Sequence, residues 1–75
     1  MNARQEQFYK FFMEKVIEEK KEEAKKLLEE TFEKQNKGNF NIQYFREVAP
    51  KYMALVKDEH KDGLNKVMEQ YSSSL

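Results

Sequence analysis

Apolar residues recur at helical spacing along most of the chain, whereas glycine and proline are scarce. The sequence has 2 glycines and 1 proline in 75 residues, and it is rich in alanine, leucine, glutamate, lysine and methionine. Residues of these types favour helices over strands. The pattern therefore predicts one all-α domain over residues 1–75, with a helix at about 3–35, a turn at 36–41, a helix at about 42–71 and a tail at 72–75.

Local signals support these boundaries. Asn2 stands at the expected N-cap of the first helix, and Gln5 follows three positions later, as in a capping box. Gly38 can adopt the left-handed backbone that ends a helix, and Asn39 or Asn41 can cap the next one. A short turn between two long helices favours an antiparallel hairpin. No repeat with a period of about 20 to 50 residues is apparent.

Pro50 is the main irregularity of the second helix. The apolar stripe on this helix continues past both Pro50 and Gly63 at about 100° per residue. We therefore predict a single helix that is kinked at Pro50, since proline removes one helical hydrogen bond. The alternative is a break at Pro50 or Gly63, which would give a compact three-helix monomer.

The apolar surface of these helices exceeds what a two-helix hairpin can cover. Apolar residues before position 17 spread over about 200° of the first helix, and those after position 26 spread in the other direction. Aromatic rings left in water would form a patch larger than monomers usually expose. We therefore expect a homodimer that forms a four-helix bundle, with a compact monomer and a heterologous partner as alternatives.

The charge balance narrows the classes of partner. Charged residues make up 37% of the chain, but 14 lysines and arginines balance 14 aspartates and glutamates. Neutrality argues against binding to nucleic acid or to anionic lipid. The chain has no cysteine, no apolar run of the length that a membrane helix needs, and no signal-peptide pattern at its start. These features favour a cytoplasmic protein.

The stretch DEHKDGLNKVME, residues 58–69, resembles an EF-hand calcium loop in part. Asp58, Asp62 and Glu69 fall at ligand positions, and Gly63 falls at the position of the sharp turn. His60, however, occupies a position where calcium requires an oxygen ligand. On a helix, the three carboxylates would simply share a solvated face. We favour the helical interpretation and keep a calcium-binding module as the alternative function.

Catalytic chemistry has less support in the sequence. The chain has no cysteine nucleophile and too few glycines for a phosphate-binding loop. Its serines Ser72, Ser73 and Ser74 lie far along the chain from the single His60. We therefore expect a protein that is not an enzyme and that needs no cofactor.

The excess of aromatic residues without a chemical motif favours a role in association. We expect a small adaptor or regulator that self-associates and binds another protein through exposed helix faces. The candidate interaction residues form a first patch near the N-terminus and a second patch near the turn. They are Phe8, Tyr9, Phe11 and Phe12 in the first patch, and Phe40 and Tyr44 in the second. Each of these rings is also a candidate for the core, because hydrophobic stripes form cores more often than binding sites.

Overall fold

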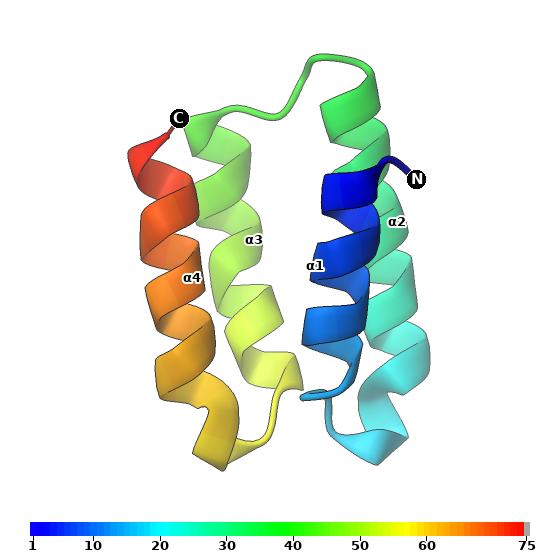
Figure 1. The fold of residues 1–75 in the computed structure, drawn as a ribbon, viewed down its shortest axis with the longest axis vertical. Coiled ribbons are helices and arrows are strands. Elements are labelled where there is room, and N and C mark those ends of the chain that lie inside the picture. The colour runs from blue at the N-terminus through cyan, green and yellow to red at the C-terminus, as the bar shows by residue number, and fades with distance from the viewer. Residues whose placement is uncertain (75) are drawn as a thin grey trace.

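The computed structural model describes residues 1–74 and is all-α over that range, with four main helices and two short 3-10 turns (Figure 1). The four helices form a bundle around a shared interior, with α1 and α4 nearer the viewer and α2 and α3 behind them (Figure 1). The elements are α1 (Ala3–Met13), η1 (Glu18–Lys20), α2 (Lys21–Asn36), α3 (Ile42–Leu55), η2 (Asp58–His60) and α4 (Lys61–Ser73).

The expected all-α class is confirmed, but the two-helix hairpin is wrong. The predicted first helix is interrupted at residues 14–17, and the predicted second helix is interrupted at residues 56 and 57. The reason lies in the directions of the apolar faces. In one uninterrupted helix, the apolar faces of α1 and α2 would point in different directions. The break after Met13 lets both faces pack against the same core. One chain therefore supplies four helices, where we had expected two chains.

The second helix does not break at either of the residues that we had considered. α3 continues through Pro50, which lies in the helix interior. Pro50 has no N–H to donate to the carbonyl of Arg46, but both residues are exposed, so water can satisfy that carbonyl. Gly63 lies within α4, and no heavy atom lies within 4 Å of where its Cβ would be. The chain changes direction at Val56 and Lys57 instead, between Pro50 and Gly63.

The fold consists of two similar helix–loop–helix units. We call α1, η1 and α2 the first unit, and α3, η2 and α4 the second unit. η2 begins 40 residues after η1, and α4 begins 40 residues after α2. Val16 and Val56, which lie in the two loops, are also 40 residues apart. The two units therefore form a structural repeat with an offset of 40 residues. Few identities mark it in the sequence, among them Met13 with Met53 and Lys21 with Lys61, so the sequence pattern did not predict it.

The loops of the two units are joined at one end of the molecule, which we call the tied end. Val16 and Val56 form an antiparallel bridge, and both side chains are buried. The Ile17 N–H donates to the Leu55 carbonyl (2.9 Å), and the Lys57 N–H donates to the Lys15 carbonyl (3.0 Å). These two backbone bonds fix the register between the units. They lie at the bottom of the view in Figure 1.

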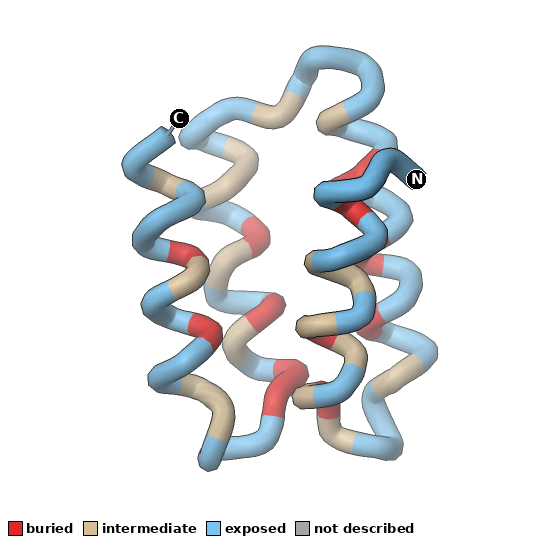
Figure 2. The backbone as a smooth tube through the Cα atoms, viewed as in Figure 1, coloured by how far each residue is buried: buried red, intermediate tan, exposed pale blue. Residues whose placement is uncertain are grey.

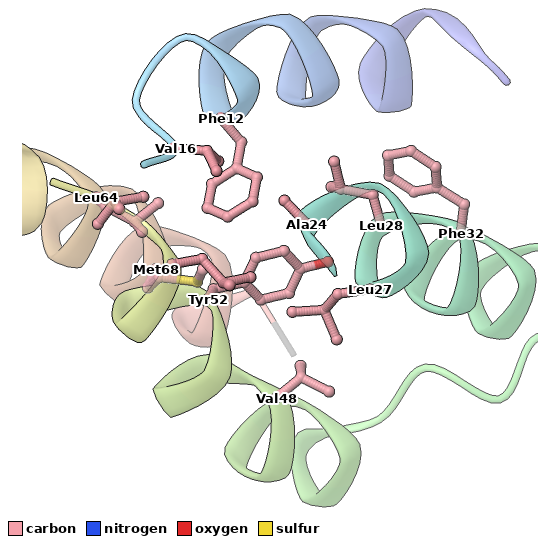
Figure 3. Close-up of a cluster of buried hydrophobic side chains, with 12 residues drawn as sticks. Phe12, Val16, Ala24, Leu27, Leu28, Phe32, Val48, Tyr52, Leu64 and Met68 are labelled. Carbon is pink, nitrogen blue, oxygen red and sulfur yellow. The ribbon is translucent and has the colours of Figure 1, made fainter. Parts of the chain in front are cut away.

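The core runs along the inner sides of all four helices (Figure 2). The ring of Tyr52 lies in the middle of it, with Phe12 nearby and Leu27 and Met68 to either side (Figure 3). Phe12 and Tyr52 pack edge to face at 4.9 Å between centroids. Full burial of a side chain of this size contributes about 1.5–3 kcal/mol. The buried apolar residues are Phe12, Val16, Ala24, Leu27, Leu28, Phe32, Val48, Tyr52, Leu55, Val56, Leu64 and Met68.

The predicted caps are confirmed. The Asn2 side chain accepts from the Gln5 N–H at 2.8 Å, and the Gln5 side chain accepts from the Asn2 N–H at 3.1 Å, which completes a capping box. Asn41 caps α3 by accepting from the Tyr44 N–H. Gly38 has a φ of +74°, as expected for the residue that ends α2. The helix ends are therefore set by local sequence.

Candidate functional site

An open cleft of about 280 Å³ lies between the two units at the end of the molecule opposite the tied end, where residues 37–41 connect α2 to α3. Its lining residues come from the start of α1 and the end of α2 on one side, and from α3, the preceding Phe40 and the end of α4 on the other. Figure 1 shows these helix ends at the top of the view. Its buried lining residues include Thr31, Val48, Tyr52 and Met68, each at most 7% exposed. The cleft therefore continues from the core to the surface.

Aromatic rings line the walls of the cleft. Phe45 stacks on Tyr71 at 6.3 Å, and Phe40 packs edge to face against Tyr71 at 5.6 Å. On the opposite wall, Phe8 packs edge to face against Tyr52 at 5.8 Å. Phe8, Phe40 and Phe45 are half-buried, and Tyr71 is 40% exposed. These walls present apolar surface to solvent that a bound group could cover.

A hydrogen bond at the base of the cleft fixes the central ring. The Thr31 hydroxyl donates its one proton to the Leu27 carbonyl at 2.9 Å. The Tyr52 hydroxyl, 2.6 Å from the Thr31 oxygen, must therefore be the donor in that pair. Burial raises the pKa of Tyr52 strongly, and the bond that the neutral phenol donates to Thr31 does not favour ionisation. Tyr52 is thus held neutral between the two units.

A polar network holds the first wall in place. Gln5 is only 3% exposed, and its side-chain amide donates to Gln35 at 2.9 Å and to Asn36 at 3.2 Å. Its oxygen accepts from the Asn2 N–H in the capping box. All polar atoms of the Gln5 side chain therefore have partners, which buried polar groups require. The network fastens the first turn of α1 to the last turn of α2.

Two side chains meet at the mouth of the cleft. The Gln35 amide donates to the Tyr71 hydroxyl at 2.5 Å and so links α2 to α4.

Arg4 is exposed and lies close enough to influence Tyr71. Burial raises the pKa of Tyr71, and the charge of Arg4 partly counters that rise. Arg4 is the one charged side chain among the described residues that line the cleft. The mouth is therefore weakly positive, although the chain as a whole is neutral.

The structure divides the first predicted patch between different environments. Phe12 is fully buried and belongs to the core, and Phe8 lines the cleft. Tyr9 lies on the other side of α1, in a shallow depression that it shares with Met1. Phe11 is half-buried, and the Lys15 ammonium lies over its ring at 3.9 Å. These four side chains therefore do not form one surface.

The second predicted patch is divided in the same way. Phe40 lines the cleft, whereas Tyr44 lies outside it, with the Lys34 ammonium 5.5 Å from its ring centroid. The two rings touch edge to face at 5.6 Å. The Tyr44 hydroxyl is enclosed and has no hydrogen-bond partner among the described residues. Of the six predicted interaction residues, only Phe8 and Phe40 reach the cleft.

The three carboxylates of the calcium alternative are not brought together. Asp58 lies in η2 with a fully exposed side chain, whereas Asp62 and Glu69 lie in opposite halves of α4. Glu69 accepts a hydrogen bond from Asn65. Within residues 1–74, no three histidine, aspartate or glutamate side chains are grouped as metal ligands. Most of the stretch 58–69 forms a helix, in agreement with the helical interpretation.

The sequence interpretation did not select Arg4, Gln35, Phe45 or Tyr71 as site residues. They lie far apart in the sequence and become neighbours only because the two units fold against each other. One signal was available: Phe45 and Tyr71 belong to the apolar stripe of residues 42–71 and lie at its two ends, where a hairpin brings them together. No pattern in the sequence marked Arg4.

No family model, curated protein or solved structure matches this chain. None of the helices in residues 1–74 is long and apolar enough to cross a membrane. A proposal about the function of this protein therefore rests on the cleft and the residues that line it.

Proposed function

We propose that this protein is a non-catalytic interaction module whose cleft receives the apolar face of a helix from a partner protein. The observation that carries this proposal is the aromatic cleft between two units that are tied at one end. Its half-buried rings, among them Phe8 and Phe45, continue directly from the core. A partner that covered them would gain about 25 cal/mol per Å² of apolar surface removed from water.

The size and shape of the cleft favour side chains over a free ligand. Pockets for small molecules usually measure about 300–1,000 Å³ and enclose most of the ligand. This cleft, at about 280 Å³, lies at the lower end of that range and is open on one side. It has room for one or two large apolar side chains, and helices on both sides form its walls. Grooves between helices commonly accept the anchor residues of an amphipathic helix.

A second copy of the chain is the other partner that we considered. The predicted homodimer rested on aromatic rings that two helices could not cover, and four helices now cover most of them. The radius of gyration, 11.7 Å, is close to the value of about 11 Å expected for a folded domain of this length. Self-association stays a prediction, and sedimentation equilibrium at high protein concentration tests it.

Selection from a library of displayed amphipathic helical peptides tests the proposed function. Val67 is half-buried and lines the cleft, whereas its neighbour Lys66 is exposed and does not. We expect the unaltered protein and the Lys66→Trp variant to bind the same peptides. The Val67→Trp variant should lose at least tenfold in affinity, because the indole fills the space that an anchor side chain needs.

Circular dichroism should first show that both tryptophan variants are folded. Equal binding by the two variants would contradict a role for the cleft. If, in that case, Tyr9→Ala alone abolished binding, the outer face of α1 would be the interaction surface instead.

A further inference from the structure

Arg4 is the one charged side chain among the described residues that line the cleft. Arg4 makes neither an ion pair nor a hydrogen bond with any side chain among residues 1–74. The nearest acidic residue on the same helix, Glu6, is paired with Lys10 at 3.6 Å. The guanidinium therefore keeps all its donors free at the mouth.

The other polar groups at the mouth are neutral, and most are already bonded. Gln35 donates to Tyr71, and Gln5 donates to Gln35 and Asn36. The described residues that line the cleft include no aspartate or glutamate. A group that entered beside Arg4 would therefore meet a positive charge with no compensating negative charge next to it. A carboxylate fits that position, because arginine can bind it through two parallel hydrogen bonds.

We propose that the partner helix carries a carboxylate side chain beside its apolar anchor, and that Arg4 pairs with it at the mouth of the cleft. This inference rests on the proposed function and adds the charge of the partner. The apolar anchor enters between the aromatic walls, and the acidic residue one helical turn away lies at the rim. Rim charges of this kind decide between partners and increase association rates more than they increase affinity.

The chain offers a matched control for Arg4. Arg46 is also exposed, lies near the start of its helix, and does not line the cleft. The variants Arg4→Gln and Arg46→Gln change the net charge equally. A difference between them therefore reports the position of the charge rather than its amount.

The test uses three synthetic helix-forming peptides with one shared leucine and phenylalanine face. Their flanking polar positions are all glutamate, all glutamine or all lysine. Fluorescence polarisation gives the affinity of each peptide for the unaltered protein and for both variants. We expect the glutamate peptide to bind about fivefold more tightly than the glutamine peptide, and the lysine peptide to bind most weakly.

The two variants should then differ. Arg4→Gln should remove the preference for the glutamate peptide, and Arg46→Gln should keep it. Added salt should reduce the preference in the unaltered protein, because the pair is exposed to solvent.

The remaining outcomes would contradict either the inference about Arg4 alone or the proposed function together with it. Equal affinity of the unaltered protein for the glutamate and glutamine peptides would overturn the inference and leave the interaction module standing. An equal loss of preference in both variants would also overturn it, because net charge would then be the cause. If none of the three peptides bound the unaltered protein, the proposed function and this inference would fail together.

Discussion

At the residue scale, the two glycines illustrate how local conformation and packing determine the effect of a substitution. Gly38 ends α2 with a positive φ, which side chains with a Cβ adopt only at a cost. Gly63 lies in the first turn of α4 with ordinary helical geometry and open space around it. Gly63 is exposed, although the apolar stripe predicted for residues 42–71 continues past it.

Alanine at the two positions should change stability in opposite directions. Gly63→Ala should raise the free energy of unfolding by about 0.5–1 kcal/mol, since alanine loses less backbone freedom on folding. Gly38→Ala should lower it by about 1 kcal/mol or more, because of the left-handed backbone. Urea unfolding followed by circular dichroism measures both. Destabilisation by Gly63→Ala would mean that a neighbour packs closely against that position.

Tyr52 should make stability depend on pH in the alkaline range. Burial raises its pKa above the ordinary value of 10.0, so the folded state holds the proton more tightly than the unfolded chain does. The stabilisation is complete below pH 10 and falls as the pH rises, by at most about 1.4 kcal/mol per pH unit. The loss ends only when the pKa of the folded state has been passed.

The Tyr52→Phe variant separates the pH dependence of stability that Tyr52 causes from that caused by other titrating groups. At neutral pH the variant should be less stable by about 1 kcal/mol, because the Thr31 hydroxyl loses its donor. Above pH 10 the unaltered protein should lose stability more steeply than the variant, so the difference between them should shrink. Denaturant titrations at several pH values provide the measurement. Parallel pH profiles would show that Tyr52 titrates normally and is less buried than described.

At the scale of elements, the helical content and the capped helix ends could be predicted from the sequence. The two breaks within the predicted helices could not. Asn2, Asn41 and Gly38 act locally, so their roles could be predicted from neighbouring residues alone. The breaks before Val16 and Val56 depend on the other unit, because each loop supplies the bridge partner of the other. The change in direction of the apolar face between Phe12 and Leu28 was visible in the sequence. We interpreted it as excess surface, whereas it marks a turn.

The bridge between the loops should contribute measurable stability. Lys57 is exposed, and its φ of −63° suits proline, but its N–H donates to the Lys15 carbonyl. Lys57→Pro should therefore be about 1 kcal/mol less stable than Lys57→Ala, which keeps the N–H. Thermal unfolding of the two variants measures the difference. Equal stability would mean that side-chain packing alone joins the two units.

At the scale of the whole molecule, the all-α fold class could be predicted, but the number of helices in one chain could not. Four helices surround one core as expected, but they belong to one chain. The residues of the candidate site could likewise be predicted only in part from the sequence. Phe8 and Phe40 were selected for their aromatic character. Arg4 and Gln35, by contrast, reach the cleft only because the start, the middle and the end of the chain meet there. Single-sequence patterns describe the faces of helices and contain little about which helix ends come together.

The central claim is that the cleft at the end opposite the tied end is the binding site. It requires access from solvent, so covalent closure of the mouth should abolish binding without unfolding the chain. Gln35 and Tyr71 face each other across the mouth and are hydrogen-bonded. The chain has no cysteine, so the pair Gln35→Cys and Tyr71→Cys can be cross-linked selectively with a short bismaleimide.

The most direct measurement compares the affinity of this double-cysteine protein for its selected peptide before and after cross-linking. Circular dichroism serves as the control for folding. Our account predicts that the reduced protein binds and that the cross-linked protein loses at least tenfold in affinity. Unchanged affinity after complete cross-linking would contradict it and would move the binding site to another surface.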